Sequence, residues 1–530
     1  MTRRVDAVFR GGTVVDGSGD EAFEADVAVD KGRILEVRES VDYLGTTEVD
    51  CTGQIVCPGF IDVHAHDDLA AVMPGGLEPK IAQGVTSTIV GNCGHGVSPS
   101  GQYGREIRSY SSPVLGAGPD SWPWPDLNAY LSDLHEAAPP IKVHTLVPHG
   151  VARMSVMGFA ARAATPSEAS AIVAAVRKGL DDGAIGVSFG LMYAPACFAG
   201  TTELIAVAGE AAKRGAILSV HLRAEGEHIF DALAELHEIV VETGVSVHVS
   251  HLKCTGARSH GRMGEVIGEL DRWRARGIAV TGDVYPYTAG STTICAMLPE
   301  FALEGGVEQL LINLRDDPFR QKVVQALTRP WRRAENHLLA CGPDNIALTG
   351  LHALSELEGR TVADVSRARG MSPEAALLDV VMQEQGRAGV IQHQGSEDDL
   401  RTALAWPHTM IGSDGLPAPP GSKPHPRLFG TFPRMLGRYV REGRHLTLED
   451  AIHRMTGQPA KRFNLRGEGT LEPGTPADVV VFDPTTVIDA ATYRDPQQGP
   501  AGINQVWVNG RPLIGASQRL TVAARYWTQS

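Results

Sequence analysis

Cysteine is scarce in this chain and shows no pairing pattern. Seven cysteines are spread over 530 residues, and no two of them form a CxxC pair. An odd number at scattered spacings argues against a disulfide framework. Thiols stay unpaired where the surroundings are reducing. We therefore expect the protein to work in a reducing compartment, the cytoplasm.

Long apolar runs and an excess of positive charge are also missing. The chain has no run of roughly 18 apolar residues, the length that marks a membrane span. Arginines at positions 3 and 4 have no apolar segment behind them, so we expect no signal peptide. Lysine and arginine number 48 against 62 acidic residues, a net charge of −14. Because phosphate binding needs a basic patch, this balance argues against a nucleic-acid partner.

Short runs rich in β-branched residues occur at both ends of the chain. They are separated by Gly, Asp and Lys turns, a pattern typical of strands. The runs lie at 7–10, 13–16, 26–29, 33–37, 477–482 and 506–511. The simplest arrangement is one small β domain built from both termini, residues 1–57 and 465–530, with a large domain inserted between them.

Strand and helix signals alternate through the middle of the chain. Apolar runs occur at 86–90, 142–147, 185–188, 217–220, 245–249 and 278–281, with helical segments such as 166–180 and 227–243 between them. This alternation indicates the α/β class with parallel βα units. About eight units predict a TIM-like (β/α)8 barrel over residues 58–464. Residues from about 290 to 408 are too long for one loop, so we expect an inserted lid or subdomain there.

Two histidines one residue apart follow an apolar run. His64 and His66 end the segment 58–66, and acidic residues come directly after them. In a strand, residues i and i+2 point to the same face. The two imidazoles can therefore share one metal ion, although a bare His-x-His is also found as two unrelated surface residues.

Other metal-binding or acidic groups follow later predicted strands. These are Cys93, His221, His251 and Asp414. Each has an ordinary structural explanation: a buried cysteine packs as a small apolar group, a strand-end histidine hydrogen-bonds, and an aspartate forms turns. All of them nevertheless fall at the carboxyl ends of strands, where barrel enzymes place their active sites. Imidazole, thiolate and carboxylate together suit zinc.

The chain resembles the amidohydrolase superfamily, and within it the N-acyl-D-amino-acid deacylase (D-aminoacylase) branch. The motifs that carry the resemblance span nearly the whole chain in order. They lie at 58–68, 83–94, 190–195, 221–225, 250–253, 283–292, 412–417, 425–434 and 474–478. Each motif is weak alone, but the set is highly specific. The stretches 101–125 and 300–400 have no counterpart in this pattern.

The resemblance implies a metal centre with a bridging cysteine. Many amidohydrolases bridge two metals with a carboxylated lysine, and in this branch a cysteine matching Cys93 takes that place. Cys93, His221 and His251 would hold one tight zinc ion. His64 and His66 would form a weaker second site that shares Cys93.

The resemblance also implies roles around the metal. Asp414 matches the general base and acid, and Lys253, Tyr285 and Arg427 match the groups that bind the α-carboxylate of the substrate. An Arg fork and a Lys point charge suit a carboxylate.

These features predict a zinc-dependent amidohydrolase that cleaves N-acyl-D-amino acids to a carboxylate and a free D-amino acid. Its partner is then a small-molecule substrate, with neither nucleic acid nor membrane. The alternative keeps fold and metal but takes a cyclic amide or a dipeptide with a D-residue. A third interpretation is a non-catalytic metal-binding or assembly protein on the same barrel. The acyl group, the side chain, the number of working metals, the oligomeric state and the catabolic or biosynthetic role stay open.

Overall fold

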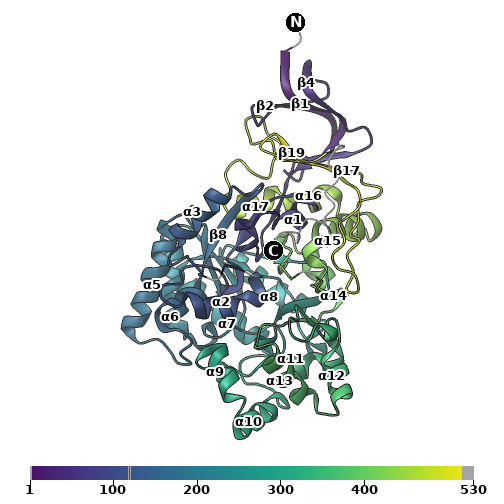
Figure 1. Ribbon diagram of the computed structural model, residues 1–530. Helices are drawn as coiled ribbons and strands as arrows, with labels where there is room; N and C mark the ends of the chain where they lie inside the picture. Colours follow the sequence, from purple (N-terminus) through teal and green to yellow (C-terminus); the bar gives the residue numbers. More distant parts are fainter. Residues whose placement is uncertain (1–2, 117, 120, 420, 516–530) are drawn as a thin grey trace.

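The computed structural model describes residues 3–116, 118–119, 121–419 and 421–515. Its centre is an eight-stranded, all-parallel sheet that curls into a nearly closed barrel, as predicted (Figure 1). In chain order the strands are β6 (Phe60–Asp62), β7 (Val85–Val90), β8 (Lys142–Pro148), β9 (Gly186–Gly190), β10 (Ile217–His221), β11 (Ser246–Val249), β12 (Val280–Val284) and β16 (Thr409–Ile411). Each strand pairs with the next.

The first and last strands meet just beyond their ends. Ala65 and Gly415 form an isolated parallel bridge, and Asp414 N donates to His64 O at 2.7 Å. The barrel therefore closes at the segments that carry His64, His66 and Asp414.

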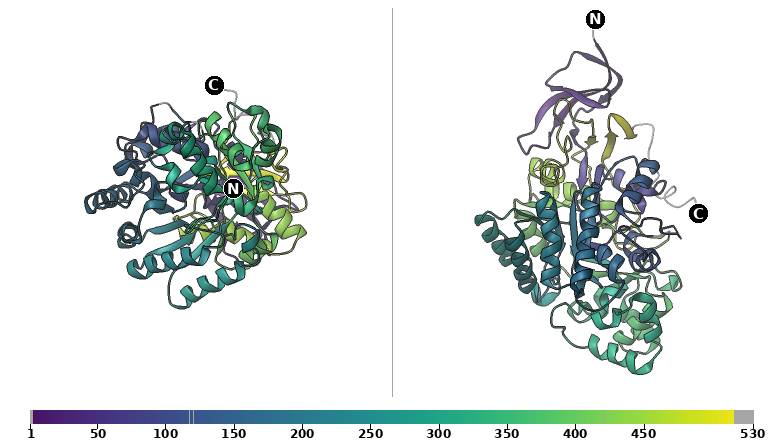
Figure 2. Two further views of the ribbon diagram at one scale, coloured as in Figure 1. Left: turned by 90° about the horizontal axis from the view of Figure 1, so that it is seen from below. Right: turned by 90° about the vertical axis from the view of Figure 1, so that its left-hand side faces the viewer.

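Helices surround the barrel on its outer side, as Figure 2 shows. They include α5 (Pro166–Asp181), α6 (Thr201–Lys213), α7 (Ile229–Thr243) and α8 (Met263–Ala275). Helix α5 begins at a capping box in which Thr165 and Glu168 satisfy each other's backbone N–H groups, with Pro166 in the first turn. This local signal explains why α5 begins at the first residue of its predicted segment; α7, which has no side-chain cap, begins two residues after the start of its own.

One predicted barrel strand is displaced. The run at 278–281 was expected to be a strand, but β12 covers Val280–Val284. Ile278 N still donates to Trp273 O in the turn that ends α8, so Ile278 belongs to the helix terminus.

A second sheet combines both ends of the described chain. Its strand order is β19-β18-β17-β5-β1-β2-β3, and β4 also pairs with β1. The N-terminal strands are β1 (Arg3–Val14), β2 (Phe23–Asp30), β3 (Arg33–Arg38), β4 (Tyr43–Asp50) and β5 (Ile55–Pro58); the C-terminal ones are β17 (Val479–Phe482), β18 (Ile503–Val508) and β19 (Arg511–Ile514). The predicted strands 7–10 and 13–16 prove to be one strand, β1, with a register shift between Phe9 and Gly12. Residues 516–530 of the predicted C-terminal part lie outside the described residues.

The long insertion carries its own sheet and core. Strands β13 (Ala289–Thr293), β15 (Gly389–His393) and β14 (Ile346–Thr349) form a three-stranded antiparallel sheet. Helices α9 (Gly306–Asn313), α10 (Asp317–Leu327), α11 (His337–Cys341), α12 (Val362–Arg369) and α13 (Pro373–Gln383) accompany it. Figure 1 places this subdomain at the end of the barrel opposite the terminal sheet. No helix among the described residues is long and apolar enough to cross a bilayer.

Candidate metal centre and active site

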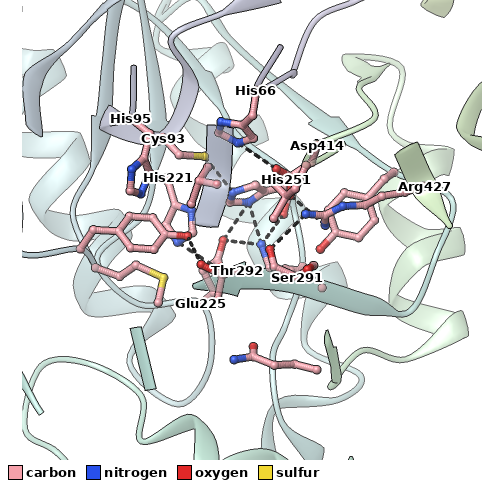
Figure 3. A pocket seen from close by; sticks show the side chains of 18 of the residues that line it. His66, Cys93, His95, His221, Glu225, His251, Ser291, Thr292, Asp414 and Arg427 are labelled. Carbon is pink, nitrogen blue, oxygen red and sulfur yellow. Dashed lines mark hydrogen bonds and ion pairs between the residues drawn. The ribbon is translucent and has the colours of Figure 1, made fainter. Parts of the chain in front are cut away.

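Three buried side chains meet at the carboxyl ends of barrel strands. His64 follows β6, Cys93 follows β7 and His251 follows β11. The Nε2 atom of His64 lies 3.2 Å from Cys93 Sγ, and Nε2 of His251 lies 3.4 Å from the same sulfur. The three donor atoms lie within 4.8 Å of one another, close enough to share one metal ion. Figure 3 shows Cys93 and His251 turned toward each other in the middle of the pocket.

A second group of donor atoms shares His64. His66 Nε2 lies 3.1 Å from Asp414 Oδ1, and His64 Nε2 lies 3.5 Å from the same oxygen. These three side chains also place donor atoms within 4.8 Å of one another. Because Nδ1 of His64 faces Asp283, Nε2 is its one metal-binding atom, and the donor atoms lie around two adjacent positions.

His221, at the end of β10, tests whether a metal fits. Its side chain is buried, yet neither ring nitrogen has a hydrogen-bond partner among the described residues. The ring centroid lies 4.4 Å from that of His251, and these two histidines and Glu225 form a third group of close donor atoms. An unpartnered buried polar group costs about 1–3 kcal/mol, and a metal ion would supply the missing partner. Thiolate and imidazole are the donors zinc prefers, so the residues fit a zinc centre.

The cluster favours the thiolate form of Cys93. Burial alone would raise the pKa of this thiol, but the neighbouring charges of His64 and His251 outweigh it and hold the pKa well below its ordinary value. A thiolate is the form that binds metal. Cys93 is therefore poised as a ligand by its surroundings.

Glu225 connects His251 to Lys253. Its Oε1 accepts from Lys253 Nζ at 2.8 Å and lies 2.9 Å from His251 Nδ1. A carboxylate on one ring nitrogen orients the other toward a metal. Burial would raise the pKa of Glu225, but Lys253 and the two histidines lower it, so the carboxylate stays ionised. The sequence-based prediction missed this role, although Glu225 lies in one of the motifs.

Asp414 lies between the histidines and a buried arginine. Its Oδ2 is 2.9 Å from Arg427 Nη1, and the guanidinium lies over the Tyr285 ring at 4.5 Å. Arg427 is fully buried, and its Nε has no hydrogen-bond partner among the described residues. Lys253 and Tyr285 line the same cavity. The two cations, and the unpartnered Nε of Arg427 among the described residues, make this wall a place for an anion.

The structure thus brings the predicted residues together. The cavity is lined by all of them except His64, which is buried against Cys93. The family model for the amidohydrolase family matches residues 47–514. The chain belongs to the amidohydrolase family.

Well-studied relatives cover nearly all of this amidohydrolase. D-aminoacylase of Alcaligenes xylosoxydans xylosoxydans is 36% identical, over 96% of this chain and 94% of the relative. N-acyl-D-glutamate deacylase of the same organism is also 36% identical, with the same coverage. The solved N-acyl-D-glutamate deacylase of Bordetella bronchiseptica, complexed with zinc and a phosphonate that mimics the tetrahedral intermediate, has a TM-score of 0.83 at 34% identity, covering 96% of both chains. An L-hydantoinase of Arthrobacter aurescens, at 15% identity and a TM-score of 0.55 over 97% of both chains, shares the fold alone.

A buried ion-pair network underlies the paired histidines of this amidohydrolase. Lys80 Nζ lies 2.5 Å from Asp62 Oδ2, 3.2 Å from Asp67 Oδ2 and 2.6 Å from Ser413 Oγ. Asp62 Oδ1 also accepts from Ser413 N at 2.8 Å. The network therefore joins the segments after β6 and β16, which carry His66 and Asp414. The sequence did not predict this network, because a single lysine in a sequence is usually expected to be exposed to solvent.

Asp283 holds His64 from the interior of the barrel. Its Oδ2 lies 3.2 Å from His64 Nδ1 and 2.9 Å from His248 Nε2, and its Oδ1 accepts from His251 N at 3.0 Å. One carboxylate thus fixes the ring of His64 and the backbone of His251. Asp283 lies on strand β12, where the only sequence signal was its place in a motif.

Proposed function

We propose that this amidohydrolase hydrolyses the amide bond of N-acyl-D-amino acids in a zinc-dependent reaction. The observation that carries the proposal is a metal-donor cluster centred on Cys93, with an ionised Asp414 next to it and two cations beyond. The sequence and structural similarity to D-aminoacylase and the N-acyl-D-glutamate deacylases supports it.

We assign the zinc ligands from the resemblance to the D-aminoacylase branch, and the donor groups support it by placing Cys93 and His221 each close to His251. Cys93, His221 and His251 would hold the tight ion, and His64 and His66 with Cys93 would hold a weaker second one. When bound, zinc polarises an amide carbonyl and lowers the pKa of water towards ~7. Glu225 and Asp283 keep the imidazoles of His251 and His64 turned toward these ions.

Asp414 is assigned as the general base and acid. Burial alone would raise the pKa of its carboxyl, but Arg427 and His64 outweigh that effect and hold it well below the ordinary value. The ionised carboxylate can accept the proton of the attacking water and pass it to the leaving amine.

The α-carboxylate of the substrate is assigned to Lys253, Tyr285 and Arg427. Arg427 offers a planar fork, Lys253 a point charge and Tyr285 a hydroxyl. Anchoring the carboxylate there and the carbonyl at the metal leaves the D- and L-forms with their third substituent in different directions.

We also propose a cellular location, a partner and the domain boundaries of this protein. The seven cysteines are all free, which supports a reducing, cytoplasmic location. The partner is a small molecule. We retain the division into 1–57 with 465–530, the barrel 58–464 and the lid at about 290–408.

The replacement of Asp414 tests the proposal. In zinc-loaded Asp414→Asn we expect kcat for an N-acetyl-D-amino acid to fall by roughly 10²–10⁴-fold, because proton transfer is lost. Zinc at the tight site, measured by metal analysis, stays at the wild-type value, because Cys93, His221 and His251 are unchanged. The exposed Asp398→Asn on helix α14 (Glu397–Ala405) is the matched control. Undiminished turnover in Asp414→Asn would contradict the assignment.

A further inference from the structure

A second cavity adjoins the metal centre. It shares Met192, Tyr193 and His337 with the first cavity and extends to Tyr110. Its volume is about 20 Å³. A water molecule needs about 10–15 Å³, so this space, with the part of the first cavity that it joins, holds a short group of a few heavy atoms.

Unpartnered polar atoms gather where the two cavities meet. Among the described residues, both ring nitrogens of His95, the hydroxyl of Tyr110 and Nδ1 of His337 have no hydrogen-bond partner. The exposed fractions of these side chains are only 1%, 6% and 5%. His95 of the first cavity stacks on Tyr110 of the second with ring centroids 5.1 Å apart, and His337 lines both cavities. Each buried polar atom without a hydrogen-bond partner costs about 1–3 kcal/mol unless a ligand supplies that partner.

The charges around the second cavity disfavour an anion. Its one lining cation among the described residues is Arg223, which is already bonded to Glu235 at 2.8 Å and to the carbonyl of Cys197 at 2.8 Å. Glu300 and Glu335 also line this cavity. A carboxylate placed here would be desolvated beside two acids, and the lining guanidinium of Arg223 is already committed.

The position relative to the proposed carboxylate site completes the argument. Figure 3 shows His95 and Arg427 on opposite sides of the pair Cys93 and His251. A substrate with its carboxylate at Arg427 and its amide at the metal centre therefore extends another substituent toward His95.

We propose that His95, Tyr110 and His337 bind a short, uncharged hydrogen-bonding group of the substrate, such as a hydroxyl or a carboxamide, and discriminate against a carboxylate there. The proposal rests on the proposed function. The group belongs either to the D-amino-acid side chain or to the acyl group. If it belongs to the side chain, this enzyme differs in preference from a deacylase for acidic D-amino acids.

The test compares substrates of similar shape on the zinc-loaded, full-length enzyme. The side-chain arm uses the N-acetyl forms of D-asparagine, D-leucine and D-aspartate. The acyl arm uses D-alanine carrying glycoloyl, propanoyl or oxalyl groups. In one arm we expect kcat/KM for the neutral polar substrate to exceed kcat/KM for the apolar and the charged substrate by about tenfold or more. The reason is that an apolar or charged analogue leaves the buried polar atoms of His95, Tyr110 and His337 without hydrogen-bond partners.

Variants test whether His95 and Tyr110 cause the preference for the neutral polar substrate. Tyr110→Phe and His95→Phe each bring the ratio of polar to apolar kcat/KM in that arm towards one. Tyr103→Phe, a matched change at the start of the same helix α2 (Gly104–Leu115), leaves the ratio unchanged. Equal rates for the polar and apolar members in both arms, or a preference for the carboxylate, would overturn the pocket assignment alone. An enzyme that turns over no D-substrate of either arm would contradict the proposed function itself, and the pocket assignment with it.

Discussion

Three residues of the site hold backbone conformations that side chains other than glycine rarely adopt. Cys93, His251 and Asp414 have φ values of +54°, +36° and +48°. Each costs on the order of 1 kcal/mol or more. All three lie directly after barrel strands, where the positive φ turns the side chain into the cavity. The surrounding sheet sustains this strain, and the donor cluster depends on it.

Asp283 acts as a positioning residue and not as a metal ligand. In Asp283→Asn the imidazole of His64 loses its anionic partner, so we expect zinc affinity at the second site to weaken by roughly 10–100-fold. Metal titration of the apo-enzyme measures this directly. Asp271→Asn, whose carboxylate bonds Trp406 away from the cavity, is the control and leaves affinity unchanged. An unaltered second-site affinity in Asp283→Asn would show that His64 is held by its strand alone.

Among the elements, the closure of the barrel depends on charge as well as on hydrogen bonding. Lys80, 1% exposed, neutralises Asp62 and Asp67 between the ends of β6 and β16. Lys80→Met leaves two buried carboxylates uncompensated, and we expect the free energy of unfolding to fall by about 3–5 kcal/mol. Urea unfolding followed by circular dichroism measures the loss.

An ion pair on the surface provides the control for Lys80→Met. Lys178 and Asp182 lie 2.7 Å apart on and just after helix α5, and the Lys178 side chain is half exposed. Lys178→Met should change the free energy of unfolding by less than about 1 kcal/mol, since exposed pairs are screened by water. Losses of the same size in both variants would argue that Lys80 has no special role.

Elements near in sequence were predictable, and contacts between distant elements were not. Alternation at period two placed His64 and His66 on one face, and β-branched runs located most barrel strands. The roles of Asp283 and Lys80 could not be predicted from the sequence, because these roles depend on which strand ends lie beside the two residues. The lining residues His337 and Gln394 of the inserted subdomain were equally hard to predict, since no motif of the sequence includes them.

For the whole molecule, acid should weaken the fold through histidines buried in the neutral form. Burial lowers the pKa of His337 to about 4, against roughly 6.5 in an unfolded chain. Between these values the unfolded state binds a proton that the folded state does not, so stability decreases as the pH falls from 6.5 toward 4. Melting temperatures of the zinc-loaded enzyme across this range should decline. His337→Gln makes the decline shallower, and the exposed His135→Gln does not; equal slopes in all three proteins would contradict this source of acid sensitivity.

The most direct measurement of the central claim is amine release from matched D- and L-pairs of N-acetyl amino acids by the zinc-loaded enzyme. The proposed deacylase function predicts turnover of the D-forms only, with the amide at the donor cluster of Cys93 and the carboxylate at Arg427. Turnover of the L-forms, or of neither form while zinc is bound, would contradict the account and direct attention to cyclic amides or peptides with a D-residue.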